Sequence, residues 1–392
     1  MENLEQLKDY IPGEISPSFW KDKRVLITGH TGFKGSWLLC WLECMGAKTL
    51  GLSLPSIDPK SVFHNISNEK KKHSYLDLND YPNVEKCLRK FSPEIVFHLA
   101  AQPLVRESYK DPLNTYKTNV IGTLHLLEAS RSVDSIRSII IITTDKCYEN
   151  KEWNWGYREN DPLGGYDPYS NSKACVEMLV SAYRNSFFPL KDYETHRVCI
   201  STARAGNIYG GGDRGKDRLI PDAVRSIEEN KSIVIRNPHA IRPWQYILDP
   251  LRGYLVLAQK AFFSSEVSGS WNFAPNEKKA SAVSEVMDLF CRKWGEEKKW
   301  IAIKKEDEPH ETTILRLDCS QANALLHWEA RIPLPLGIGL TVEWYKTYIE
   351  DPSLKKMLDV TLKQIYTYGL SQRSHKNPER IKQEKTKVLS NF

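Results

Sequence analysis

Five short, mostly apolar segments in the first 150 residues constrain the fold more than any other feature of the sequence. They lie at 24–28, 48–54, 75–78, 94–100 and 138–143, and stretches of helix length separate most of them. Apolar strands of this kind have to be covered on both faces, and helices on either side of a parallel sheet provide that cover. The spacing therefore predicts an α/β protein built on a doubly wound parallel sheet.

The turn after the first segment carries three evenly spaced glycines, Gly29, Gly32 and Gly35. Glycine lets backbone amides approach a pyrophosphate closely, and the N-terminus of the following helix stabilises the negative charge. Three glycines could also be plain turn residues. Their place between the first strand and the first helix, expected at 37–45, favours a dinucleotide site.

This Gly-x-x-Gly-x-x-Gly spacing resembles the fingerprint of the extended short-chain dehydrogenase/reductase family. The resemblance implies a nicotinamide cofactor, with an Asp after the third strand at adenine and an Ala-rich turn after the fourth strand. At the end of the second strand Ser53 could hydrogen-bond the adenosine ribose, and no Arg stands there for a 2′-phosphate, so we expect NAD. The residues expected to bind it are Gly29, Thr31, Gly32, Phe33, Lys34, Gly35, Ser53, Asp77, Leu78, Leu99, Ala100, Ala101, Gln102, Thr143, Tyr169 and Lys173.

The second half of the chain is less regular. We expect helices at 113–130 and 168–185 and a strand at 196–203, followed by a mixture rich in Pro, Gly and Trp. This mixture predicts a smaller α/β substrate-binding part that is interleaved with the Rossmann-type sheet. The expected boundaries are an N-terminal extension at 1–23, a cofactor-binding part at 24–206 with later returns near 243–275, a substrate-binding part at 207–370, and a basic, disordered tail at 371–392.

Tyr169 and Lys173 stand four residues apart on a predicted helix, so their side chains share one face. Such a pair is often structural. The segment 143–146 gives it weight, because it ends the fifth strand and open α/β sheets bind ligands outside the carboxyl ends of their strands. A phenol has a pKa near 10, and a neighbouring ammonium together with a cationic nicotinamide would favour the phenolate.

The residues after Thr144 separate the relatives that share this pair. Epimerases have no acid and base there, and dTDP-glucose dehydratases carry Thr-Asp-Glu. The sequence Thr144-Asp145-Lys146 resembles instead the CDP-glucose 4,6-dehydratases, and the resemblance spans about 24–344. It implies that Thr144 and Tyr169 hold the sugar for oxidation at carbon 4. It also implies that Asp145 protonates the departing carbon-6 hydroxyl, that Lys146 removes the carbon-5 proton, and that CDP-glucose is the substrate.

Lys146 has to be neutral to act as a base, which requires a lowered pKa. Burial and the positive charge of Lys173 would both lower it. The alternative is a surface ion pair between Asp145 and Lys146 that takes no part in chemistry.

A diphosphate needs cationic or backbone donors, and Arg106, Arg218 and Arg242 are the candidates. By resemblance, Asn207 and Arg242 match positions that bind substrate, whereas surface ion pairs stay open for the other two. His310 is assigned to the substrate-binding part. It lies beside Glu311, but no third ligand follows at a sensible spacing, so no metal is expected.

Charge and cysteine content bear on the partners and the cellular location of the protein. The formal charge of +6 comes largely from the tail at 371–392, which lacks the aromatic residues typical of nucleic-acid binding, so no nucleic acid partner is expected. The eight cysteines are scattered, and the N-terminus lacks the apolar core of a signal peptide. We therefore expect a cytoplasmic protein with no membrane partner, and by resemblance a homodimer.

Three alternatives remain open from the sequence. A dehydratase of another nucleotide sugar, such as dTDP-glucose, differs only in its base contacts. An epimerase would have no use for Asp145 and Lys146. A non-catalytic NAD-sensing protein would be expected to lack Tyr169, Lys173 or both.

Overall fold

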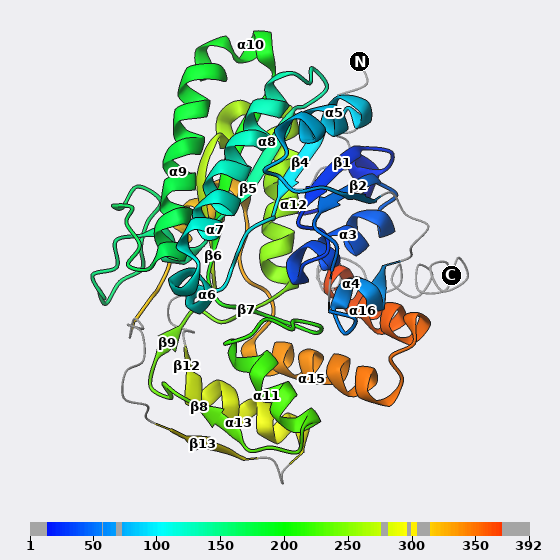
Figure 1. Cartoon of the computed structure of the whole chain (residues 1–392), viewed down its shortest axis with the longest axis vertical. Coiled ribbons are helices and arrows are strands. Elements are labelled where there is room, and N and C mark those ends of the chain that lie inside the picture. Colours follow the sequence, from blue (N-terminus) through cyan, green and yellow to red (C-terminus); the bar gives the residue numbers. More distant parts are fainter. Residues whose placement is uncertain are drawn as a thin grey trace.

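A seven-stranded parallel sheet forms the centre of the protein (Figure 1). The computed structural model describes residues 14–56, 58–67, 73–275, 281–295, 299–303 and 314–370. The strands follow the order β11-β6-β5-β4-β1-β2-β3. They are β1 (Arg24–Thr28), β2 (Lys48–Ser53), β3 (His73–Tyr75), β4 (Ile95–His98), β5 (Ser138–Ile142), β6 (Cys199–Ala205) and β11 (Gly269–Phe273). The strand order reverses between β1 and β4, which places a crevice at the carboxyl ends of these strands. The predicted doubly wound sheet is confirmed.

Successive side chains of a central strand point to opposite faces of the sheet, so apolar side chains lie on both faces and both are covered by helices. Ile140 and Ile142 of β5 pack into one hydrophobic cluster, together with helices α3 (Phe33–Cys44) and α12 (Leu248–Phe263). Ile139 and Ile141 pack into a second cluster on the other face. The helices of that face are α5 (Tyr81–Phe91), α8 (Gly122–Arg131) and α9 (Pro168–Phe187). A strand that contributes to two cores carries apolar residues in succession, as β5 does from Ile139 to Ile142.

Three predicted elements differ from the structure. The third strand is His73–Tyr75 and not 75–78, because the Asp77 side chain accepts the backbone N–H of Asn79 and starts a turn. The strand expected from 196 begins at Cys199, after a short helix that ends with Arg197 in the left-handed conformation. The helix expected at 113–130 is a continuous run of three pieces, namely α7 (Pro112–Tyr116), the π-helical turn η1 (Lys117–Ile121) and α8.

The remaining elements form a smaller region below the sheet in Figure 1. Its strands pair only in twos, β7 with β10, β9 with β12 and β8 with β13. These strands are β7 (Ile208–Tyr209), β8 (Ile233–Ile235), β9 (Ile241–Arg242), β10 (Gln245–Tyr246), β12 (Ser281–Ala282) and β13 (Trp300–Ala302). Its main helices are α11 (Leu219–Glu228), α13 (Val283–Trp294), α15 (Leu334–Glu350) and α16 (Leu354–Leu370).

Short helices complete the described chain. They are α2 (Pro17–Trp20), α4 (Val62–Ile66), α6 (Val105–Lys110), η2 (Asp145–Cys147), η3 (Leu190–Asp192), α10 (Tyr193–His196), η4 (Ser265–Val267) and α14 (Ser320–Leu326). Residues 1–13 of the predicted extension and the predicted tail at 371–392 lie outside the described residues. Within the described part, no helix has the length and apolar character needed to span a bilayer.

Candidate active site

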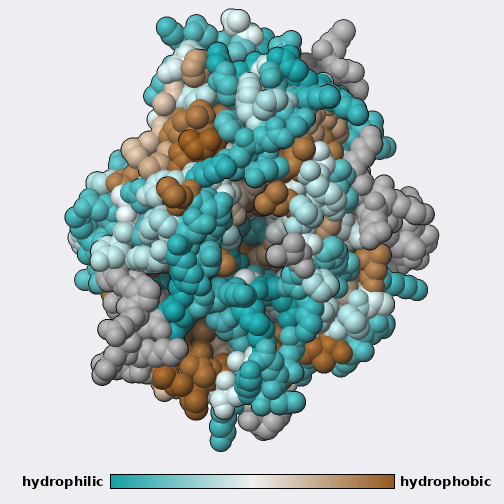
Figure 2. Space-filling view, in the orientation of Figure 1, coloured by the Kyte–Doolittle hydropathy of each residue, from teal (hydrophilic) through white to brown (hydrophobic). Residues whose placement is uncertain are grey.

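A cavity of about 1450 Å³ opens at the carboxyl ends of the sheet strands. It appears as a hollow near the centre of the face shown in Figure 2. Its walls come from the glycine loop after β1, the ends of β2, β5 and β6, the turn after β4, and residues 206–210 and 212–222 of the smaller region. A cavity of this size exceeds that of an ordinary small-ligand pocket, so it can hold a dinucleotide and a second nucleotide together.

The glycine loop is shaped for close approach of a ligand to the backbone. Gly29 has a φ of +70°, and a Cβ atom there would lie 2.6 Å from the amide nitrogen of Ala100. A Cβ at Gly35 would lie 2.2 Å from the carbonyl oxygen of Gly29. Helix α3 begins at Phe33 with Gly32 as its N-cap, so its first amides face the same cavity. The loop therefore fits a dinucleotide pyrophosphate.

Ser53 lies at the end of β2, where its hydroxyl group belongs to a small polar network. The Thr31 and Ser53 hydroxyls are 3.0 Å apart, and His30 Nδ1 is 3.1 Å from Ser53 Oγ. Burial lowers the pKa of His30 to about 4, and the nearby His73 adds to this shift. The network thus presents neutral hydrogen-bonding groups at the position where a ribose would lie, with Asp77 on the same wall.

The turn after β4 is held by a residue that the sequence analysis did not single out. Asn119, in the π-helical turn η1, accepts the backbone N–H of Gln102 at 2.8 Å and donates to its carbonyl oxygen at 3.1 Å. It also donates to Ser172 Oγ at 2.9 Å. Asn119 therefore joins the predicted cofactor turn to helix α9. An isolated Asn inside a helical segment gives no sequence signal for this role.

The segment after β5 places Thr144, Asp145 and Lys146 in one short helical turn. Thr144 Oγ1 donates to Asp145 Oδ1 at 3.1 Å and accepts the backbone N–H of Lys146 at 3.3 Å. Asp145 is buried, and this burial raises the pKa of its carboxyl group against the opposing effects of Lys146, Thr144 and Arg242. Its second oxygen, Oδ2, has no hydrogen-bond partner among the described residues. A buried carboxyl group of this kind is suited to hold a proton.

Helix α9 carries Tyr169, which lines the cavity, and Lys173, which is buried one helical turn further along. Asp167 caps the helix by accepting the N–H of Ser170 at 2.9 Å. Burial raises the pKa of Tyr169 to about 12, opposed by a hydrogen bond with Thr144 and by the charge of Arg218. Lys173 donates to the carbonyl oxygen of Ile142 at 3.1 Å. The sequence analysis expected Lys173 to lower the pKa of the phenol, which stays a prediction, and the structure adds Arg218 as a cation that lowers this pKa.

The lysines of the site differ in their surroundings. Burial lowers the pKa of Lys173 to about 8, and that of Lys34, next to Lys173 and Arg218, to about 7. The surface of Lys34 that stays open faces the cavity. Lys146 lines the cavity and is only half-buried, less than the sequence analysis assumed. Lys173 does not contribute to the cavity wall.

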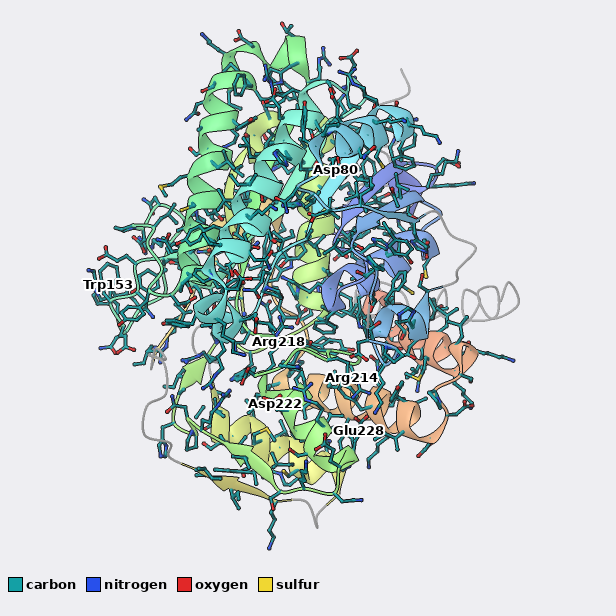
Figure 3. All side chains as sticks on the ribbon, in the orientation of Figure 1. Asp80, Trp153, Arg214, Arg218, Asp222 and Glu228 are labelled. Atoms are coloured by element: carbon teal, nitrogen blue, oxygen red, sulfur yellow. The ribbon has the colours of Figure 1, made fainter. Side chains whose placement is uncertain are left out.

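The predicted diphosphate-binding residues Arg106, Asn207, Arg218 and Arg242 all line the cavity. Arg218 lies near the centre of the molecule, beside α11 (Figure 3), and donates both to Asp213 Oδ1 and to Oδ2 at 3.0 Å. Arg106 pairs with Asp217 at 3.5 Å.

Two cavity residues of the smaller region were not foreseen. Arg236 pairs with Asp217 at 3.1 Å, so it shares this carboxylate with Arg106, and Asn237 follows it on the cavity wall. His310 lies outside the described residues. In the part of the chain that the structure describes, no three His, Cys, Asp or Glu side chains are grouped so that they could hold a metal ion.

Comparison with known sequences gives close relatives. The profile of the family described as GDP-mannose 4,6 dehydratase matches residues 26–340. A CDP-glucose 4,6-dehydratase from Salmonella typhimurium is 49% identical over 337 residues, which cover 86% of this chain and 94% of the relative. A dTDP-glucose 4,6-dehydratase from Haemophilus influenzae is 25% identical, with 82% of this chain and 97% of the relative covered.

Solved structures show the same fold at lower identity. The UDP-glucose 4-epimerase of Thermotoga maritima, solved with UDP-glucose, has a TM-score of 0.72 and 22% identity, and the match covers 83% of this chain and 99% of that one. A dTDP-glucose 4,6-dehydratase from Bacillus anthracis, solved with NAD, has a TM-score of 0.69 and 20% identity, with 84% and 98% covered. Given the profile match and the identity to the Salmonella relative, the chain belongs to the 4,6-dehydratase family of nucleotide-sugar enzymes, within the extended short-chain dehydrogenases/reductases.

Proposed function

We propose that the protein converts CDP-glucose to CDP-4-keto-6-deoxyglucose and water. The observation that carries this proposal is the position of Asp145 and Lys146, an acid and an amine, beside Thr144 and Tyr169 in one cavity. The identity of 49% to a CDP-glucose 4,6-dehydratase supports the choice of nucleotide. NAD, bound along the glycine loop, would supply the acceptor for a hydride from carbon 4 and the donor that returns it to carbon 6.

In the oxidation step, Tyr169 takes the proton of the carbon-4 hydroxyl as hydride leaves carbon 4. Thr144, which hydrogen-bonds to Tyr169, orients that hydroxyl group. The pKa of Tyr169 is about 12 in this environment, even with the lowering effects of Thr144 and Arg218, so it has to fall further before the phenol can act as a base. The positive charge of a nicotinamide bound beside it would lower this pKa. The product of this step is a 4-keto sugar, whose carbon-5 hydrogen is acidic.

In the elimination step, Asp145 and Lys146 act on neighbouring carbons. Lys146 removes the proton from carbon 5, and Asp145 gives its proton to the hydroxyl group that leaves carbon 6 as water. Burial favours the protonated form of Asp145, because it raises the pKa of the carboxyl group. Hydride return to carbon 6 and a proton at carbon 5 then complete the product, so no second substrate is consumed.

Mass spectrometry of the products tests this function directly. Purified protein with NAD is offered CDP-glucose, dTDP-glucose, UDP-glucose and GDP-mannose in separate reactions, and we expect loss of one water from CDP-glucose alone. Loss of water from another of these compounds would support the mechanism but contradict CDP-glucose as the substrate. An isomer without loss of water would indicate an epimerase, and no reaction with any of the four would contradict the proposed enzyme.

Two variants test whether Lys146 is the base that removes the carbon-5 proton. Lys146→Ala is expected to form the 4-keto sugar without losing water, because oxidation needs Tyr169 and elimination needs the amine. Lys151→Ala is the matched control, since Lys151 is a lysine of the same loop that forms an ion pair with Glu149. Full dehydration by Lys146→Ala would remove Lys146 from the mechanism.

We also infer that two copies associate through the face formed by α7, η1 and α9. Leu113, Ile121 and Met178 expose 84%, 40% and 55% of their surface on these elements. Hydrophobic residues also gather near α8 and α9 in Figure 2. Exposed apolar patches of this kind are typical of protein interfaces. Light scattering would measure the expected dimer, and a monomer at micromolar concentration would contradict it.

None of the eight cysteines, all of which lie in the described part of the chain, forms a disulfide bond, and this supports the proposal of a reducing, cytoplasmic location.

A further inference from the structure

Glu177 is a buried carboxylate that the mechanism above does not use. It lies on α9, one helical turn after Lys173, and it is only 2% exposed. Four side chains donate hydrogen bonds to it. These donors are Thr143 Oγ1 at 2.5 Å, Thr202 Oγ1 at 2.7 Å, Arg204 Nη2 at 2.8 Å and Ser270 Oγ at 3.1 Å. Such a fully satisfied carboxylate keeps its charge, and its pKa is lowered despite its burial.

The donors connect α9 to the carboxyl ends of the strands. Thr143 directly follows β5 and precedes Thr144, so its hydrogen bond to Glu177 fixes the start of the turn that carries Asp145. Thr202 belongs to the neighbouring strand β6. Because Glu177 is on the same helix as Tyr169, it joins the two elements that carry the catalytic residues.

Arg204 extends this connection to the next loop. Its guanidinium group is 2% exposed and donates to Tyr148 Oη at 2.7 Å and to the carbonyl oxygen of Glu159 at 2.9 Å. The ring of Tyr148 also lies 4.9 Å from the guanidinium carbon. A buried ion pair is often no more stable than an apolar replacement, so stability alone is a weak reason for placing one here.

We propose that Glu177 is a positioning residue of the reaction, which holds the Thr144–Lys146 turn against Tyr169 and provides the counter-charge of Lys173. This proposal rests on the proposed function, because the catalytic roles of Tyr169 and of the Thr144–Lys146 turn come from that reaction. It predicts two separate effects, one on geometry and one on charge.

The charge effect follows from the groups that face Lys173. Burial lowers the pKa of this amine to about 8, while Glu177 and Cys147 oppose the shift. The charges of Lys34, from the glycine loop, and of His98, at the end of β4, also interact with Lys173. Removing the carboxylate therefore lowers the pKa of Lys173 further, and its positive charge is lost at a lower pH.

The variant Glu177→Gln tests both effects, because it keeps the shape of the side chain and removes the charge. We measure kcat and KM against pH, with the nucleotide sugar that the wild-type protein converts. The expected result is a fall in kcat of about 10- to 100-fold with little change in KM, as misplacement of reacting groups produces. The alkaline limb of the kcat profile should move by about one pH unit toward lower pH.

Ser270→Ala is the matched control. It removes one donor to the same carboxylate, but Ser270 lies on β11, which carries none of the proposed catalytic residues. We expect kcat and the alkaline limb of this variant to match those of the wild type. A displaced limb in Ser270→Ala as large as that in Glu177→Gln would overturn the proposal, because any disturbance of the network would then have the same effect.

A double variant covers the case in which Glu177→Gln does not fold. Combining it with Arg204→Met removes both buried charges, which avoids an unpaired guanidinium group. The folded double variant should keep the lowered kcat and the displaced limb. A folded variant with the alkaline limb of the wild type would overturn the proposal, whatever its kcat, since Glu177 would then serve stability only. Failure of CDP-glucose in the wild-type assay is a different outcome and concerns the proposed function.

Discussion

The two halves of the cavity, which we propose to bind cofactor and substrate, are built from different kinds of groups. The cofactor half is built around backbone, in the loop of Gly29 and Gly35 between β1 and α3, with a few neutral side chains such as Ser53 beside it. The substrate half consists of charged side chains on short strands and loops, and several of these are held in ion pairs. Arg214, for example, donates to both carboxylate oxygens of Glu228 at 3.0 Å, and Figure 3 shows the two side chains close together beside α11.

This difference explains how each half can change. A backbone site tolerates almost no added atom, because the approach distances are fixed by the sheet. Where such a pair is partly exposed, as Arg106 and Asp217 are, one partner can be exchanged at a modest cost, since exposed ion pairs contribute little to stability. Enzymes of this fold could therefore keep one cofactor site and change the nucleotide sugar.

The largest expected effect lies where the two halves meet. Tyr169→Phe should lower kcat about 1000-fold, because the phenol is the proposed base for the oxidation. Tyr109→Phe, on α6 and outside the cavity wall, is the control and should leave kcat unchanged. Steady-state kinetics measures both variants. A loss of less than about 10-fold would place the base elsewhere in the site.

A smaller effect is expected in the cofactor half. A Cβ at Gly35 would lie 2.2 Å from the Gly29 carbonyl oxygen, so Gly35→Ala has to displace the loop. We expect affinity for NAD to fall about 100-fold, the effect of a misplacement near 1 Å, while KM for the nucleotide sugar at saturating NAD stays close to wild type. Calorimetric titration with NAD measures the first quantity.

The glycine control lies outside the cavity. Gly339→Ala changes a glycine of α15 whose added Cβ would have no neighbour closer than 4.0 Å, and it should leave NAD affinity unchanged. If Gly35→Ala raised KM for the sugar as strongly as it weakens NAD binding, the two halves would not be separable.

The smallest effect is expected in the substrate half. Arg106 is partly exposed and shares Asp217 with Arg236, which remains after substitution. Arg106→Gln should therefore raise KM for the nucleotide sugar about 10-fold, as expected for one charged hydrogen bond. Arg89→Gln, which breaks an exposed ion pair on α5, should have no effect on KM. A loss of kcat in Arg106→Gln with unchanged KM would argue against diphosphate binding.

The sequence predicted the features that depend on local pattern. The central strands were found because they are short and mostly apolar, and the helix of Tyr169 and Lys173 was found from its spacing. The third strand was misplaced, because apolar Leu76 and Leu78 flank a turn that the side chain of Asp77 stabilises.

Features that depend on contacts between distant segments could not be predicted in this way. Arg236 lines the cavity and shares the carboxylate of Asp217 with Arg106, and no local sequence pattern predicts a contact between these distant residues. The effect of Arg218 on Tyr169 is of the same kind. The strands of the smaller region have only two or three residues, which is too short for a periodic pattern to be recognised in the sequence.

The π-helical turn η1 changes the angular phase of a helix that continues on both sides of it. A turn with one extra residue rotates all following side chains by about 100° relative to an uninterrupted α-helix. Asn119 points inward to the Gln102 turn, and Ile121, two residues later, is 40% exposed. Deleting one residue from 117–121 would restore a regular α-helix and turn these two surfaces away from their present directions. One extra residue in η1 therefore sets the angle between the side chain that holds the cofactor turn and the surface of the proposed subunit contact.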